Sequence, residues 1–128
     1  MEKYSNETDV YLLIPKDEFA KKLKETINVG ENLLNAVVDE NYLFLKFKDD
    51  FYNWHIFNFK FLESSFNIAR NKYFLEYQNK VIHYASSVPP ALNLSRQVEV
   101  QNIKSEVLKY LDGLNSIQQQ IVFMEVRN

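Results

Sequence analysis

The sequence contains no cysteine, and it has only two glycines and three prolines among its 128 residues. Without cysteine, the chain can form neither a disulfide framework nor a thiolate metal site, and it has no cysteine nucleophile. Two glycines are too few for the Gly-rich loops that bind phosphates in Rossmann and P-loop proteins. They are also too few for most compact all-β folds, which need glycine in tight turns and bulges. These absences favour a helical protein.

Long hydrophobic runs are also absent. Apolar stretches such as Leu43–Leu45 fall far short of the ~20 residues that a membrane-spanning helix needs. The first 20 residues contain five acidic side chains, which argues against a secretory signal or transit peptide. We therefore expect a cytoplasmic protein that does not associate with membranes.

A strong excess of charge of one sign is missing as well. The net charge is -2, and the most basic stretch, residues 41–85, has six bases against four acids. Nucleic-acid binding normally requires a clustered basic surface, so we expect no nucleic-acid partner. Lys46, Lys48 and Lys60 are interpreted as a solvated helix face.

Hydrophobic residues are plentiful: they make up 46% of the chain, and 19 residues are aromatic. A chain of this length has room for one domain with one hydrophobic core. We predict an all-α, four-helix bundle-like domain over residues 15–128. An extended N-terminal arm over residues 1–14 precedes it.

The first helix is predicted at about residues 15–38, because Phe19, Leu23 and Ile27 begin an apolar row with helical spacing. Pro15 suits the first turn of a helix. Gly30 lies inside the pattern, where it costs on the order of 1 kcal/mol relative to alanine. It is either tolerated sequence drift or the site of a close crossing, where another helix or a large ring packs on the bare backbone.

The second helix is predicted at about residues 41–64, the most aromatic part of the chain. Apolar residues at positions 44, 47, 51, 54 and 61 keep helical spacing, although residues 42–48 alone could also begin as a strand. A third helix follows at about residues 71–86. Pro89 and Pro90 then end it within a predicted linker over residues 86–94.

The last helix is predicted to be long, from about residue 96 to residue 126, with Ser95 as its N-cap. Its apolar residues are separated by 3, 4, 3, 4, 3, 4 and 3 positions, which is the pattern of a heptad repeat. This heptad row consists of Val100, Ile103, Val107, Tyr110, Leu114, Ile117, Ile121 and Met124.

The heptad row supports two interpretations. It can pack inside the helical bundle, which uses the same spacing, or it can pair with another chain. The second interpretation predicts a homodimer interface formed by the six residues Val107, Tyr110, Leu114, Ile117, Ile121 and Met124.

Motifs for catalysis and metal binding were sought and not found. His55 and His83 lie on different predicted helices, and neither has a carboxylate or a second histidine three or four positions away. His55 is interpreted as a partly buried structural residue. We expect no catalytic residue, no metal and no cofactor, although an enzyme with a site assembled from distant residues stays open.

One set of residues resembles a known type of module. It comprises an apolar row around Gly30, a helix carrying Trp54, the pair Tyr73-Phe74 and a long Ile/Leu-rich helix, over about residues 16–126. This arrangement is similar to the small all-helical N-terminal modules of bacterial abortive-infection and TIR-like nucleotide-binding proteins. The resemblance implies a module for interaction, sensing or oligomerisation that lacks the effector chemistry, and it implies a role in anti-phage defence.

The sequence therefore predicts a non-enzymatic module for protein–protein interaction, with a second copy of the chain as its partner. The alternative is a ligand-binding module with an apolar pocket lined by aromatic side chains. Gly30, Trp54, His55 and Tyr77 are the residues predicted to form either a core crossing or the border of that pocket.

Overall fold

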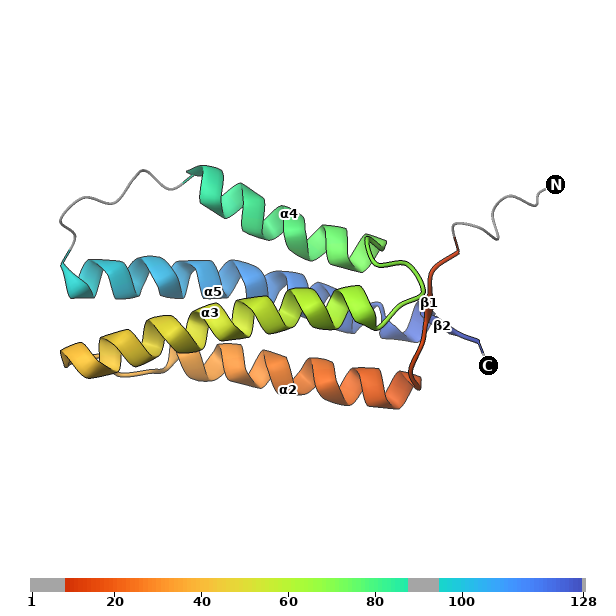
Figure 1. Cartoon of the computed structure of the whole chain (residues 1–128), viewed down its shortest axis with the longest axis horizontal. Coiled ribbons are helices and arrows are strands. Elements are labelled where there is room, and N and C mark those ends of the chain that lie inside the picture. Colours follow the sequence, from red (N-terminus) through yellow and green to blue (C-terminus); the bar gives the residue numbers. More distant parts are fainter. Residues whose placement is uncertain (1–8, 88–94, 128) are drawn as a thin grey trace.

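The computed structural model describes residues 9–87 and 95–127, and the side chains of residues 82–87 are outside this description. Within these ranges, four α-helices run up and down along one axis, each antiparallel to the next in sequence (Figure 1). The predicted all-α four-helix bundle is confirmed. The helices are α2 (Lys16–Leu34), α3 (Asn41–Ser64), α4 (Lys72–Ser87) and α5 (Arg96–Gln119).

The first helix is shorter than predicted, since α2 ends at Leu34 rather than near residue 38. Asn35 ends it by donating its side-chain Nδ2 to the carbonyl oxygen of Glu31 at 3.1 Å. Just beyond Asn35, the Lys104 ammonium group of α5 donates a hydrogen bond to the carbonyl oxygen of Ala36 at 2.8 Å. This carbonyl group is therefore bonded to another helix. The predicted boundary was wrong because this contact comes from a distant part of the chain.

The last helix is also shorter than predicted, since α5 ends at Gln119 rather than near residue 126. A short 3-10 helix, η1 (Ile121–Phe123), turns the chain, and the strand β2 (Glu125–Val126) follows. β2 pairs in parallel with β1 (Tyr11–Leu12), which lies in the arm predicted to be extended. The heptad row therefore leaves the helix before Ile121, because pairing with the N-terminal arm competes with helix continuation.

Other boundaries agree more closely with the sequence. α3 spans the predicted residues 41–64, so the strand interpretation of its first residues is wrong. Ser95 caps α5 by accepting a hydrogen bond from the backbone N–H of Val98 at 3.3 Å. The predicted linker overlaps the end of α4 at residues 86–87, and the rest of it lies outside the described residues.

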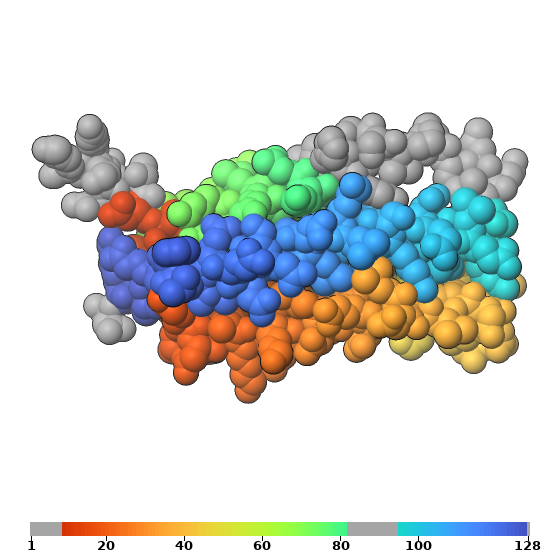
Figure 2. Space-filling model, turned by 180° about the vertical axis from the view of Figure 1, so that it is seen from behind, coloured from red at the N-terminus to blue at the C-terminus, as the bar shows by residue number. Residues whose placement is uncertain are grey.

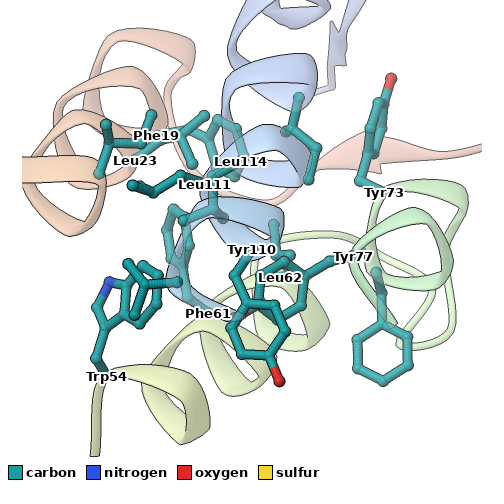
Figure 3. Packing of buried hydrophobic residues seen from close by; sticks show 14 of the residues in the cluster. Phe19, Leu23, Trp54, Phe61, Leu62, Tyr73, Tyr77, Tyr110, Leu111 and Leu114 are labelled. Atoms are coloured by element: carbon teal, nitrogen blue, oxygen red, sulfur yellow. The ribbon is translucent and has the colours of Figure 1, made fainter. Parts of the chain in front are cut away.

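The core lies along the bundle axis, with α5 as its central helix. Leu111 and Leu114 of α5 point between Phe19 and Leu23 of α2 (Figure 3), and all four are buried. α5 and α2 lie side by side along the molecule when it is seen from behind (Figure 2). Among the described residues, none of the helices combines the length and apolar character needed to cross a membrane.

Candidate functional site

The heptad row lies in the core of a single chain. Val107, Leu114 and Ile117 are fully buried, Tyr110 is 2% exposed and Met124 is 5% exposed. Ile121 is half-buried in η1. The prediction that these six residues form a homodimer interface is therefore wrong, because their side chains already pack against α2, α3 and α4. Any interface must use other residues.

Gly30 marks a close helix crossing, with the Trp54 ring and Leu111 against its bare backbone. A Cβ atom added at Gly30 would lie 2.5 Å from the Trp54 ring and 2.7 Å from Leu111 Cδ2. The Trp54 indole is fixed from a second direction, since its Nε1–H donates to the carbonyl oxygen of Thr26 at 2.7 Å. Of the two explanations for Gly30, the structure selects the close crossing.

A buried polar chain connects α2, α3 and α4 beside this crossing. The Thr26 hydroxyl donates to Asn58 Oδ1 at 2.5 Å, and Asn58 Nδ2 donates to the Tyr77 hydroxyl at 3.0 Å. Burial raises the pKa of Tyr77 above its ordinary value, so this hydroxyl stays protonated. All three side chains are buried, and their hydrogen bonds fix the relative register of the three helices.

His55 follows Trp54 on α3 and lies within an aromatic cluster, in which Tyr110 contacts both of these residues. Its ring stacks on Tyr110 at 5.1 Å and meets Phe59 edge-on at 4.9 Å. Burial lowers the pKa of His55, and its Nδ1 has no hydrogen-bond partner among the described residues. The Tyr110 hydroxyl donates to Glu106 at 2.7 Å, and burial raises the pKa of that carboxyl group.

The predicted pocket bordered by Gly30, Trp54, His55 and Tyr77 does not exist in that form. Tyr77 is fully buried and its ring centroid lies 6.3 Å from that of His55, so these two residues belong to a filled core. Trp54 lines a cavity between α2 and α3, and the lining of that cavity does not include Gly30, His55 or Tyr77. The pocket prediction is corrected accordingly. The side chain of His83 lies outside the described residues.

The cavity is a groove between α2 and α3 with a volume of about 630 Å³. Thr26, Leu33, Phe47 and Trp54 form its buried floor. Val29, Val37 and Phe57 form its walls and expose between 46% and 76% of their surface. We call this feature the α2–α3 groove. Its lining consists of Lys22, Glu25, Thr26, Val29, Asn32, Leu33, Ala36, Val37, Val38, Leu43, Lys46, Phe47, Asp50, Asn53, Trp54 and Phe57.

The α2–α3 groove was missed by sequence reasoning. Its lining on α2 stands at positions 22, 25, 26, 29, 32 and 33, and its lining on α3 at positions 43, 46, 47, 50, 53, 54 and 57. Each set recurs every three or four positions, so it is one face of its helix. These faces mix apolar, polar and charged side chains, and a search for apolar rows does not isolate such faces.

The outer surface of α3 is apolar too. Tyr42, Leu45 and Tyr52 are 65%, 62% and 62% exposed, and we call these three residues the α3 ridge. Positions 42, 45 and 52 follow helical spacing, so the three side chains lie on neighbouring parts of one face. α3 therefore carries large apolar side chains toward the core, toward the groove and toward solvent.

Two cations of α5 fix the segment that closes one end of the groove. Lys104 binds the carbonyl oxygen of Ala36, and Arg96 donates to the carbonyl oxygen of Asp39 at 3.0 Å and to Asn41 Oδ1 at 2.9 Å. Charge-assisted bonds of this kind are stronger than neutral ones. The Val37 wall is therefore held in place rather than free to cover the groove.

The charged residues of the groove lining are balanced in sign. Lys22 and Glu25 lie on α2, and Lys46 and Asp50 lie on α3. Lys46 pairs with Asp50 at 2.6 Å, and both side chains are largely exposed. Lys22 pairs with Glu18 at 3.4 Å, so two of the lining lysines are already paired within the chain. Exposed pairs of this kind contribute little to stability.

Comparison of the chain with family models, with curated proteins and with solved structures gave no match. The resemblance to helical modules of bacterial defence proteins thus stays a prediction. Within the described parts of the chain, no group of three or more His, Asp or Glu side chains is placed to hold a metal ion. The functional argument therefore rests on the groove and the ridge.

Substitution of Gly30 by alanine is expected to destabilise the protein. Overpacking against Trp54 and Leu111 costs about 1–3 kcal/mol. The higher helix propensity of alanine offsets about 1 kcal/mol of this cost. Urea unfolding followed by circular dichroism measures the difference. Gly113→Ala is the matched control, because its Cβ would meet only the flexible Lys80 side chain at 3.3 Å and Tyr77 at 3.6 Å or more. An equal or greater stability of Gly30→Ala would contradict the close crossing.

Proposed function

We propose that this chain is a non-enzymatic protein-interaction module. Its binding face consists of the α3 ridge and the α2–α3 groove beside it. The observation that supports this proposal most strongly is the set of large apolar side chains that α3 exposes: Tyr42, Leu45 and Tyr52 are each more than 60% exposed, and Phe57 is 49% exposed. Exposed apolar side chains that gather on one element favour a partner.

The groove supports the same proposal through its shape and its spacing. Its floor is fixed by the hydrogen bond of Trp54 to Thr26, so the binding surface is formed before a partner arrives. Its mixed polar edge around an apolar centre is typical of protein interfaces. A role in bacterial anti-phage defence and a place in the cytoplasm are further parts of the proposal. The first is supported by the sequence resemblance and the second by the composition.

Cross-linking in cells tests the binding face. We expect a photoreactive benzoylphenylalanine in place of Tyr52 or Val37 to form a covalent adduct with one identifiable protein. The same group in place of Leu108, which is exposed on α5, is the matched control and should form no such adduct. Mass spectrometry of the tryptic peptides identifies the partner and the cross-linked site.

Three other outcomes of this experiment would contradict the proposal. If Leu108 gave the same adduct as Tyr52, the capture would be unspecific. If neither Tyr52 nor Val37 gave an adduct, the face would have no partner in the cell. If the mass gained corresponded to a small molecule, the ligand-binding alternative would replace the interaction module, since a volume of about 630 Å³ lies within the range of small-molecule sites.

A further inference from the structure

We infer that the occupant of the α2–α3 groove is an amphipathic α-helix of another protein, and that this helix carries a lysine or arginine at the end that meets Glu25. The inference rests on the proposed function, because it names the chemistry of the partner that the groove accepts. It concerns the groove alone and makes no use of the α3 ridge.

The centre of the groove requires an elongated apolar occupant. Phe47 and Trp54 lie buried at its floor, while Val37 and Phe57 stand at its edges with 76% and 49% of their surface exposed. Along α3 the lining runs from Leu43 to Phe57, which is about 21 Å at the rise of an α-helix. An occupant that covers this length as a helix presents an apolar face about four turns long.

The conformation of the occupant follows from what the groove offers to a main chain. The lining residues of α2 and α3 lie inside helices, whose main-chain groups are bonded within each helix. An extended segment over the apolar floor would therefore bury backbone N–H and C=O groups that find no partner. An α-helix bonds these groups internally, and its side chains fit between the side-chain rows of two neighbouring helices. The groove consequently favours a helix.

The polar rim of the groove leaves one charge without a partner. Lys22 pairs with Glu18 at 3.4 Å, and Lys46 pairs with Asp50 at 2.6 Å. Glu25 is exposed on the groove lining and forms no ion pair with any residue that the structure describes. The charge that the rim lacks is therefore a cation opposite Glu25, and a partner with a lysine or arginine there supplies it.

The position of Glu25 sets the direction of the partner helix. Thr26, the next residue, bonds to Asn58 across the two helices, so Glu25 lies toward the end of the groove near Phe57. The cation of the partner therefore lies at this end, where the exposed Phe57 ring offers it a second favourable contact. The opposite end, near Lys46, disfavours a basic residue.

A second copy of the chain does not provide this helix by placing its α3 ridge in the groove of a symmetric pair. Leu45 and Tyr52 of the ridge each stand two positions from Phe47 and Trp54 of the groove floor, which is about 200° around the helix. The ridge and the groove thus face different directions. Ridge-in-groove contact between copies would be head-to-tail, and such contacts build rings or filaments instead of a two-fold dimer.

Photo-cross-linking at two points of the groove measures the conformation of the occupant. Benzoylphenylalanine is placed singly at Lys46 and at Phe57, which lie on one face of α3, eleven positions and hence about 16 Å apart. In cells, we expect both variants to label one segment of one partner protein at sites about eleven residues apart, as a helix requires. An extended segment would be labelled at sites about five residues apart, and that spacing would overturn the inference.

Glu25→Lys tests the charge of the partner. With benzoylphenylalanine at Phe57, it should lower the yield of the adduct about tenfold, because the cation of the partner would then meet a lysine. Glu31→Lys is the matched control: it makes the same change at an exposed position of α2 outside the groove lining, and the yield should stay unchanged. Equal yields from the two variants would overturn the inference.

The outcomes separate failure of this inference from failure of the proposed function. If Lys46 and Phe57 label a protein with the spacing of an extended segment, or if Tyr52 alone gives an adduct, the interaction module stands and the partner helix is wrong. Labelling of a second copy of this chain has the same meaning. If these three positions and Val37 label no protein, both proposals are wrong.

Discussion

Leu114→Asp is expected to unfold the protein rather than only dissociate it. Leu114 is fully buried in the C-terminal third of α5, where it faces Phe19 and Leu23 of α2 (Figure 3). An unpaired carboxylate at this position loses its hydration and finds no cation. Its burial, together with the lost leucine packing, costs several kcal/mol or more. Domains of this size are stable by only about 5–15 kcal/mol, so most of the folded population should disappear.

Circular dichroism at 25 °C and urea unfolding measure this loss. Leu108→Asp is the matched control, because it makes the same substitution six positions earlier on the same helix, at a side chain that is 54% exposed. It should keep the wild-type helix content. A Leu114→Asp variant that stays folded and changes only its association state would show that the heptad row is an interface and that this packing of α5 is wrong.

The helix content was predictable because it depends on local patterns. The spacing of Phe19, Leu23 and Ile27 predicted α2, and the spacing of the aromatic residues predicted α3 with both of its ends. The cap at Ser95 found the start of α5. Each signal acts within a few residues along the chain, so it can be read before the tertiary structure is known.

The two helix ends that were predicted wrongly, those of α2 and α5, depend on contacts between residues that are distant in the sequence. Lys104 binds the carbonyl oxygen of Ala36, and the pairing of Glu125–Val126 with Tyr11–Leu12 draws the chain out of α5. Arg127 strengthens that pairing through its ion pair with Asp9 at 3.1 Å. No periodicity in residues 120–127 could indicate a partner that is more than 100 positions away.

The heptad row of α5 shows a different limit. Its spacing indicates correctly that one face of the helix is covered, but the same spacing serves packing within one chain and between two chains. Burial decides between them, and Val107, Leu114 and Ile117 are fully buried by the chain itself. Large exposed apolar side chains lie on α3 at Tyr42, Leu45 and Tyr52, whereas the apolar row that the sequence indicates on this helix, at positions 44, 47, 51, 54 and 61, lies on its buried side.

The candidate site was found only in part, through two of its residues. Gly30 and Trp54 were singled out as a core crossing, and they do lie against each other. The groove between α2 and α3 was missed, because its lining mixes apolar side chains with charged residues such as Lys22 and Asp50. A search for apolar rows excludes charged positions, although the solvent-exposed edge of a groove requires charged or polar side chains.

Trp54→Ala is expected to cause the second largest loss, because Trp54 belongs both to the core and to the floor of the groove. The substitution removes the hydrogen bond to Thr26 and the contacts with Phe51 and Tyr110, whose ring centroids lie 6.4 Å and 6.2 Å away. It also leaves a cavity beside Gly30, where no Cβ atom fills the space. Truncation of a buried tryptophan typically costs about 3–5 kcal/mol.

Urea unfolding followed by circular dichroism measures this cost, since the variant lacks the only tryptophan of the chain. Phe57→Ala is the matched control: it lies one turn further along the groove side of α3 but is 49% exposed, so its truncation should cost clearly less. Equal stabilities of Trp54→Ala and Phe57→Ala would mean that the Trp54–Gly30 crossing does not organise the α2–α3 pair, and that the groove is not formed in advance of binding.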